Sequence, residues 1–352
     1  MRLNTDLLVW GMHRTRTARR LSVEEVASDS WEISPEHKAA SPPAIFLEGA
    51  LDKITAFSPW TSWEYEKPRV HGETILHSAT VAYLLRDARL NGAWLYCGAH
   101  KGERGFGEER LLNTHRSKRM RLSRAHLVSN SPGSNFFGNF VLDDFPLALL
   151  PDPEETPIVL ETKVYEHEAG YRQLLDLPRP QVVHLARADE LVVYTDFAQN
   201  ASKRSRYDTL RKRLRTALDT ADEKRIGLVY LKRGATGESR LVANEPALEA
   251  HLEKRGFEIV EPARLSAEET SRRLLDARLI VSVEGSHLSH AIYSMAGDGA
   301  FLVLEPPDRF ATPYKEFADC MDMRFAFLVG DPAEGGFSVD LDDLDRLLDR
   351  LA

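Results

Sequence analysis

The sequence predicts an α/β protein with two domains, and three observations support this. Short apolar runs alternate with helical patterns over much of the chain, which is typical of β-α-β units and parallel sheets. The chain has 352 residues, more than one compact core usually contains. A strongly basic helical pattern at residues 201–224 separates two regions of alternation and predicts a connecting helix.

The composition is that of a globular protein in a reducing compartment. Hydrophobic residues make up 43% of the chain and the formal net charge is −8, which argues against general nucleic-acid binding. The two cysteines, Cys97 and Cys320, are too few for a disulfide framework. The sequence has neither a signal-peptide pattern nor an apolar run of about 18 to 20 residues. We expect a cytoplasmic protein, with peripheral contact at the inner face of a membrane as an alternative.

Residues 225–352 show the clearest alternation. Ser266 and Glu269 have the spacing of a capping box at the start of one helix. The strand-like runs are RIGLVYL, FEIVEP, RLIVSV, AFLVLEPP and RFAFLVG, each separated from the next by a helical pattern. We expect a Rossmann-like, doubly wound domain here.

Residues 1–200 are predicted to form a second α/β domain, in which residues 1–75 are irregular. We expect a helix followed by a strand over 77–98, a strand at 125–130, an apolar helix at 135–150 and further alternation over 157–196. Two α/β domains joined by a helix predict a cleft between them, where ligands usually bind.

The segment VSVEGSHLSHAIYSM, residues 281–295, places a glycine between a predicted strand and a predicted helix. A nucleophile elbow has the pattern Gly-x-Ser-x-Gly, which Ser286 does not fit. His287 and His290 lack the spacing of a zinc-protease helix. Two interpretations remain: the amides of Gly285, Ser286 and His287 bind an anion, or Gly285 only makes a turn.

Two further features lie at the same end of the predicted sheet. Lys232 and Arg233 follow the first strand of the domain, and Arg240 returns toward it; these cations suit a diphosphate, unless they form a solvated loop. Glu305 ends the strand AFLVLE. A carboxylate there can accept hydrogen bonds from ribose hydroxyls, unless it is merely exposed at the strand end.

Asp143 and Asp144 lie in an unusually apolar segment. Such a setting raises the pKa of a carboxyl group and suits a general base, whereas the alternative is a cap or a salt bridge. The pair lacks the Asp-x-Asp metal signature, so we expect no metal there. The basic residues over 116–124 indicate a solvated face or, alternatively, contact with an anionic acceptor or anionic lipids.

Taken together and in this order, these motifs resemble glycosyltransferase family 61. NFVLDDFP matches the first family motif with Asn139, Phe140, Asp143 and Pro146. YLKRGATGESRLVANE matches the second with Arg233, Arg240, Asn244 and Glu245. VEGSHLSHAIYSM followed by LVLEPP matches the third with Gly285, Ser286, Leu288, His290 and Glu305. The resemblance covers residues 90–330.

Three positions depart from the family pattern. Asn139 replaces a histidine, Leu147 replaces a frequent arginine, and Glu284 stands where histidine is frequent. If the family histidine is catalytic, either Asp143 serves as the base here or the activity is altered, because an amide cannot accept a proton near neutral pH.

The resemblance implies a GT-B-like architecture, in which two Rossmann-like domains face a cleft and the donor binds mainly to the C-terminal one. It also implies inverting transfer without an obligatory metal or cofactor. The expected reaction moves a hexosyl or pentosyl group from a nucleotide sugar to a hydroxyl of a glycan or lipid-linked acceptor. Bacterial surface-polysaccharide, capsule or glycoconjugate synthesis is the expected setting.

Each candidate residue then receives an expected role. Asp143 would deprotonate the acceptor, whereas Asn139, Asp144 and His290 would contact the acceptor or support the site. The donor would be bound by Lys232, Arg233, Arg240, Gly285, Ser286, His287 and Glu305. Two alternatives stay open: a non-catalytic scaffold of the same fold that binds a nucleotide sugar or glycan, and a different GT-B enzyme resembling fucosyltransferases.

Overall fold

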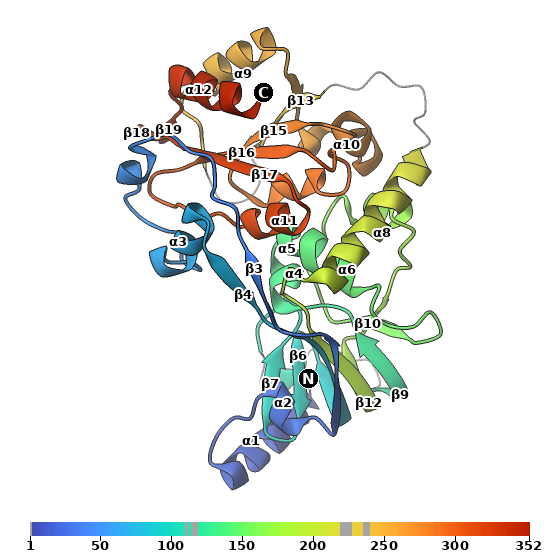
Figure 1. The fold of residues 1–352 in the computed structure, drawn as a ribbon. Coiled ribbons are helices and arrows are strands. Elements are labelled where there is room, and N and C mark those ends of the chain that lie inside the picture. Colours follow the sequence, from blue (N-terminus) through green and yellow to red (C-terminus); the bar gives the residue numbers. More distant parts are fainter. Residues whose placement is uncertain (1, 110–111, 114–118, 219–226, 235–239) are drawn as a thin grey trace. The chain divides into compact units, whose positions relative to one another are not determined.

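The computed structural model describes residues 2–109, 112–113, 119–218, 227–234 and 240–352, which form two compact units (Figure 1). Unit 1 comprises Met1–Glu36, Ser78–Glu168 and Leu177–Ala198. Unit 2 comprises His37–His77, Ala169–Asp176 and Gln199–Ala352. The expectation of an α/β fold is confirmed.

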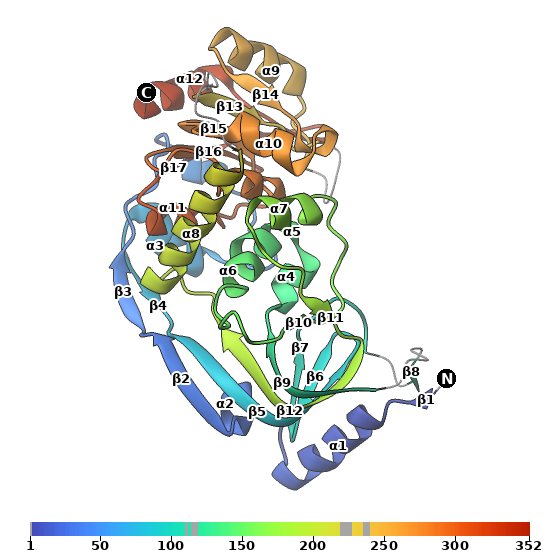
Figure 2. The same cartoon turned by 90° about the vertical axis from the view of Figure 1, so that its right-hand side faces the viewer.

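Unit 1 is built on a mixed sheet, with eight strands in the described residues (Figure 2). The strand order is β11-β10-β9-β12-β5-β6-β7, and β2 also pairs with β5. Neighbours from β11 to β12 are parallel, whereas β5 is antiparallel to β12, β6 and β2. The strands are β2 (Asp29–Ser34), β5 (Thr80–Asn91), β6 (Trp94–Cys97), β7 (His100–Glu103), β9 (Met120–Leu127), β10 (Pro157–Val159), β11 (Gln181–Val182) and β12 (Leu185–Thr195).

This sheet corrects two expectations. Unit 1 is not a purely parallel, doubly wound sheet, because β5, β6 and β7 pair in antiparallel fashion. The helix expected at the start of 77–98 is instead the strand β5. That strand has neighbours on both edges and is mostly buried, so it contains the apolar run VAYLL, which fits a buried helix equally well.

The helices of unit 1 that begin at Thr5 and Ser131 have side-chain caps. Asn4 Oδ1 accepts from the amides of Asp6 and Leu7 at 3.2 Å each, and Asn130 Oδ1 accepts from the amide of Gly133 at 2.8 Å. The apolar helix expected at 135–150 is divided into short segments. The elements are α1 (Thr5–Thr17), α2 (Val23–Val26), α4 (Ser131–Asn135), α5 (Phe137–Asn139), the π-helical turn η2 (Phe140–Asp144) and α6 (Phe145–Leu147); β1 (Arg2–Leu3) pairs with β8 (Leu112–Asn113).

Unit 2 contains the doubly wound sheet expected for the C-terminal region. In the described residues it has five parallel strands in the order β14-β13-β15-β16-β17. The direction of winding reverses between β13 and β15, which makes their carboxyl ends the switch point of the sheet. The strands are β13 (Leu228–Leu231), β14 (Glu258–Val260), β15 (Leu279–Val283), β16 (Ala300–Glu305) and β17 (Arg324–Val329).

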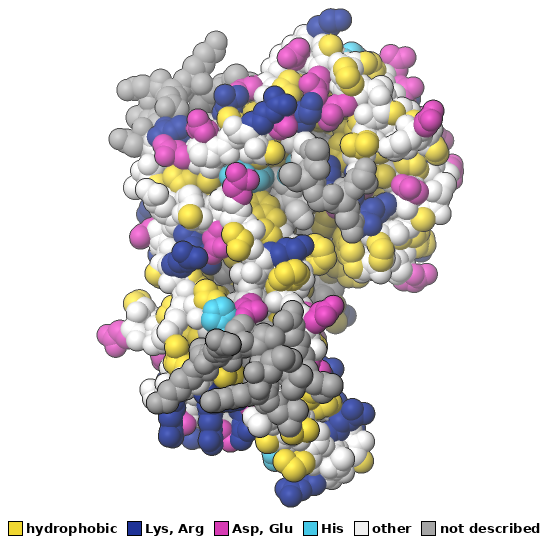
Figure 3. Space-filling model, turned by 180° about the vertical axis from the view of Figure 1, so that it is seen from behind, with side chains coloured by type: hydrophobic (Ala, Val, Ile, Leu, Met, Phe, Trp, Pro, Cys, Tyr) yellow, Lys and Arg dark blue, Asp and Glu magenta, His cyan; other side chains and the backbone are white. Residues whose placement is uncertain are grey.

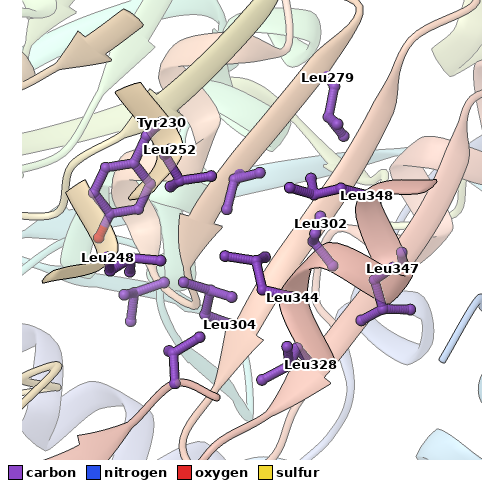
Figure 4. Packing of buried hydrophobic residues seen from close by; sticks show 14 of the residues in the cluster. Tyr230, Leu248, Leu252, Leu279, Leu302, Leu304, Leu328, Leu344, Leu347 and Leu348 are labelled. Carbon is purple, nitrogen blue, oxygen red and sulfur yellow. The ribbon is translucent and has the colours of Figure 1, made fainter. Parts of the chain in front are cut away.

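Helices cover both faces of this sheet. Leucines of α9 and α12 pack on one face against Leu302, Leu304 and Leu328 (Figure 4). On the other face Phe301 lies against Tyr314 and Phe317. The helices are α7 (Glu168–Leu174), α8 (Ala201–Leu218), α9 (Glu245–Lys254), η3 (Pro262–Arg264), α10 (Ala267–Leu274), η4 (Ser286–Ala291), α11 (Lys315–Cys320) and α12 (Leu341–Leu351). The capping box of Ser266 and Glu269 is present at α10.

Residues 37–77 pack onto unit 2, although they lie early in the sequence. The Ile45 amide donates to Phe325 O at 2.9 Å, and the Phe327 amide donates to Ile45 O at 3.1 Å, so this segment runs beside β17. Its elements are β3 (His37–Ala40), η1 (Ala50–Lys53), α3 (Trp63–His71) and β4 (Thr74–His77), and the hairpin of β18 (Asp331–Ala333) and β19 (Gly336–Ser338) follows β17.

The predicted connecting helix is α8, which belongs to unit 2; residues 219–224 of that prediction lie outside the described residues. Within the described ranges, no helix is both long and apolar enough to span a lipid bilayer.

Candidate functional site

The carboxyl ends of β13 and β15 bring Arg233, Arg240 and Gly285 together. Arg233 Nη1 donates to the carbonyl oxygen of Glu284 at 2.9 Å, and Arg240 Nη1 donates to the same oxygen at 3.2 Å. Arg240 Nε lies 3.0 Å from Glu284 Oε2, and both side chains are more than nine-tenths buried. Two guanidinium groups therefore converge at the switch point, where ligands bind in open α/β sheets.

Gly285 is required by this arrangement. Its φ is 151°, a conformation that residues with a side chain rarely adopt, and a Cβ added to it would lie 1.7 Å from Arg233 Nη1. The guanidinium of Arg233 therefore occupies the space beside the Gly285 backbone. Gly285 is therefore needed to make room for Arg233, and not only to make a turn.

The segment after Gly285 is shorter than the expected helix. Ser286–Ala291 forms one 3₁₀ helix, in which Ser289 Oγ donates to Ser286 O at 2.7 Å. An α-helix with a full set of free amides is therefore not present at this turn. The prediction of anion binding at this site therefore rests mainly on the two arginines.

His287 presents a hydrogen-bond acceptor. Ser282 Oγ lies 2.6 Å from Leu231 O and 2.7 Å from His287 Nε2. Because the hydroxyl proton is used on Leu231 O, we assign the imidazole proton to Nε2, which leaves Nδ1 as the lone-pair atom. Nδ1 is buried and has no hydrogen-bond partner among the described residues. Burial, reinforced by the charge of Arg233, lowers the pKa of His287 well below its usual range.

Lys232 points away from the arginines toward α9. Its Nζ lies 2.5 Å from Glu249 Oε1 and 3.6 Å from Glu245 Oε2. The hydrogen bond that Lys232 donates to Glu249 raises the pKa of Lys232. Two carboxylates therefore neutralise the Lys232 ammonium, which the sequence analysis assigned to diphosphate binding.

Glu305 is fully buried at the end of β16, not exposed at the strand end. Neither carboxyl oxygen has a hydrogen-bond partner of normal geometry in the described chain. Burial, together with the charges of Glu284 and Glu66, raises the pKa of Glu305 well above its usual range, and the Ala311 amide opposes this only in part. This environment favours the protonated form of Glu305, and ribose binding by a Glu305 carboxylate stays a prediction.

His290 lies one turn beyond His287 and is buried. Its Nδ1 is 2.7 Å from Tyr171 Oη, and the two rings are 5.6 Å apart. This pairing links η4 to α7. His290 therefore supports the structure around the site.

In unit 1, the acidic pair lies on the π-helical turn η2. Asp143 and Asp144 are both buried, and Asn139 Nδ2 donates to Asp143 Oδ2 at 3.0 Å. π-Helical turns are rare and frequently occur at functional sites. The residue that replaces the family histidine thus orients the candidate base.

Asp144 has a different environment from Asp143. Asn130 Nδ2 donates to its carboxylate, and a Cβ added to Gly133 would lie 2.5 Å from that carboxylate. The Asp144 carboxylate therefore packs against the first turn of α4, and the same Asn130 caps that helix. Its contacts indicate a structural role.

The basic stretch at 116–124 is paired where it is described. Arg119 bonds Asp6 at 2.6 Å, Arg121 bonds Asp189 at 3.3 Å and Arg124 bonds Glu190 at 3.0 Å. Residues 116–118 lie outside the described residues. These ion pairs make the described arginines part of an ion-paired surface. On the face seen in Figure 3, basic and acidic side chains both occur over much of the molecule.

The described part of the chain contains no group of three or more His, Cys, Asp or Glu side chains that could hold a metal ion. Metal independence stays a prediction.

Sequence reasoning missed several contributors to this site. Ser282 lies inside a strand pattern, and Tyr314 Oη donates to Gly285 O at 3.2 Å from a loop with no motif. Glu284 was noted only as a departure, although its carbonyl receives both arginines. The only sequence signal for this role of Glu284 was its position next to Gly285.

Comparison with protein families is decisive at this point. Residues 137–301 match the family model described as Glycosyltransferase 61. The expected resemblance to glycosyltransferase family 61 is confirmed over these residues, which make up just under half of the chain. The match identifies a glycosyltransferase, and the matched region includes Asn139, Asp143, Arg233, Arg240 and Gly285 but ends before Glu305.

Similarity to individual proteins is remote. One similar solved structure is the dodecameric, iron-containing heptosyltransferase TibC in complex with ADP-D-β-D-heptose, with 12% sequence identity and a TM-score of 0.28. The match covers 68% of this chain and 79% of that chain, and at this TM-score we draw nothing from it. None of the curated proteins matches this chain significantly.

Proposed function

We propose that this glycosyltransferase moves a sugar from a nucleoside-diphosphate sugar to a hydroxyl of a glycan or lipid-linked acceptor, with inversion and without an obligatory metal. Unit 2 would bind the donor and unit 1 the acceptor, as in GT-B enzymes. Surface-polysaccharide or glycoconjugate synthesis is the proposed setting. The observation that supports this most is the convergence of Arg233 and Arg240 at Gly285, on the switch point of a parallel sheet.

The arginines suit the charge that develops during transfer. As the bond between the anomeric carbon and the diphosphate breaks, negative charge grows on the leaving group. Guanidinium groups in a buried setting stabilise that charge through charge-assisted hydrogen bonds. Arg233 and Arg240 would release the Glu284 carbonyl and bind the diphosphate oxygens instead.

Asp143 is the proposed general base. It would take the proton from the acceptor hydroxyl as this attacks the anomeric carbon from the face opposite the diphosphate. The Asn139 amide supports this role, because it holds Asp143 Oδ2 at 3.0 Å and so fixes the direction of the carboxylate. Replacement of the family histidine by Asn139 is therefore compatible with catalysis.

Calorimetry with UDP, GDP, ADP and CDP tests the donor site. We expect at least one nucleoside diphosphate to bind the wild-type protein. Arg233→Ala should weaken it at least tenfold, because a charge-assisted hydrogen bond contributes about 1.5 to 3 kcal/mol. Arg346→Ala is the matched control, since Arg346 is exposed on α12. Binding of none of the four, or equal binding by wild type and Arg233→Ala, would contradict the proposal.

A further inference from the structure

A β-turn in residues 37–77 presents an exposed tryptophan. Trp60 is 54% exposed at the tip of the turn Ser58–Thr61, with Pro59 in the preceding position. The Thr61 amide donates to Ser58 O at 3.1 Å, and Thr61 Oγ1 donates to the buried carboxyl of Glu66 at 2.6 Å. These two hydrogen bonds hold the backbone of the turn that carries Trp60.

This turn lies at the ligand end of the sheet in unit 2. Residues 55–58 bond the loop that follows β16: the Thr55 amide donates to Pro307 O at 2.7 Å, and the Ser58 amide donates to Phe310 O at 3.1 Å. The Phe310 amide donates back to Ala56 O at 3.0 Å. Trp60 is two residues beyond Ser58, so its backbone is within about 7 Å of that contact.

The same loop leads to the arginine site. It runs from Phe310 to Tyr314, whose hydroxyl donates to Gly285 O at 3.2 Å. β15 and β16 are neighbouring parallel strands, about 4.8 Å apart, so the two loops begin side by side. One loop, residues 306–314, therefore contacts both the segment that leads to Trp60 and the Gly285 carbonyl beside the arginines.

We propose that Trp60 stacks on the nucleobase of the donor. This inference rests on the proposed function, which places a diphosphate at Arg233. Indole has a flat apolar face, and each nucleobase offers one in return; such stacking contributes about 1 to 3 kcal/mol per base. A single exposed apolar residue is ordinary on protein surfaces. Trp60 differs because a fixed turn holds it at the switch end of the sheet.

The stacking role predicts a selective loss of affinity. Trp60→Ala should weaken binding of the nucleoside diphosphates about 5- to 150-fold, and Trp60→Phe should retain most of it. Both variants should bind inorganic pyrophosphate as the wild type does, since pyrophosphate has no base. Trp31→Ala is the matched control, because Trp31 is 40% exposed on β2 of unit 1.

Calorimetry with the full chain, UDP, GDP, ADP, CDP and pyrophosphate separates the outcomes. Equal losses for pyrophosphate and nucleoside diphosphates would overturn the inference, because they would indicate a structural effect. Unchanged nucleoside-diphosphate binding with a raised acceptor KM would also overturn it and assign Trp60 to the acceptor. In both cases the proposed function stands if Arg233→Ala still abolishes binding. If the wild type binds no nucleoside diphosphate, the proposed function itself fails, and the inference with it.

Discussion

At the scale of single residues, Gly285 is the position where the site tolerates least change. Gly285→Ala forces a Cβ into the space of the Arg233 guanidinium and into an unfavourable φ, at a cost of about 1 to 3 kcal/mol for the backbone alone. We expect lower stability in denaturant unfolding and nucleoside-diphosphate affinity reduced as far as in Arg233→Ala.

Gly297→Ala is the control for this substitution. A Cβ at Gly297 meets no atom within 4 Å, and its φ is not in the left-handed region. We expect near wild-type stability and binding. Full affinity in Gly285→Ala would show that the position of Arg233 over Gly285 is irrelevant to the ligand.

Glu305 gives the molecule a pH dependence of defined sign. Its pKa is raised in the folded state, so between the unfolded value of 4.5 and the folded pKa only the unfolded state ionises. The contribution of Glu305 to stability is therefore complete at low pH and is lost as pH rises. Each unit by which the pKa is raised corresponds to about 1.4 kcal/mol.

The Glu305→Gln variant removes this ionisation. We expect the free energy of unfolding of Glu305→Gln, measured by urea denaturation, to increase relative to that of the wild type as pH rises from 5 to 8. Glu253→Gln, exposed on α9, should show a constant difference from the wild type. A constant difference for Glu305→Gln as well would mean that Glu305 is ionised in the folded protein.

At the scale of elements, the π-helical turn η2 determines where the candidate base points. Asp143→Asn keeps the size of the side chain and one oxygen for Asn139, so the fold should be retained. Loss of a general base lowers kcat about 10²- to 10⁴-fold. We expect this fall in transfer to a saccharide acceptor, with nucleoside-diphosphate binding unchanged; Asp152→Asn, exposed in unit 1, should transfer normally. Unchanged kcat in Asp143→Asn would make another group the base.

Elements were predictable from sequence where local signals determine them. The strands of unit 2 are short apolar runs flanked by caps such as Ser266, and strand-end positions were enough to bring Arg233 and Gly285 together. β5 was misread because its apolar pattern fits a buried helix equally well. Lys232 shares the strand end with Arg233, but its pairing with α9 depends on side-chain direction, which no motif encodes.

At the scale of the whole molecule, the hardest feature to predict is that residues 37–77 belong to unit 2. Ile45 bonds Phe325, and Ser58 bonds Phe310, far along the chain. The segment carries no regular hydrophobic period, because its partners are of several kinds, among them the edge of β17, the loop after β16 and the helix α11. Its contribution to the site, including Trp60, follows only from these long-range contacts.

Native-state hydrogen exchange tests this assignment. Leu344 is fully buried in the core cluster that also includes Leu47, so Leu344→Ala should destabilise unit 2 by about 2 to 5 kcal/mol. The amides of Ile45 and Ser58 should then exchange faster, in step with that of Leu302 in β16, because their acceptors belong to the same cooperative unit.

The amide of Val192 in β12 should keep its exchange rate in this variant, because it belongs to unit 1. Leu241→Ala is the control, since Leu241 is 53% exposed and its truncation leaves the core intact. If Ile45 and Ser58 instead followed Val192, residues 37–77 would unfold with unit 1, and the surface that presents Trp60 would not be an integral part of the donor unit.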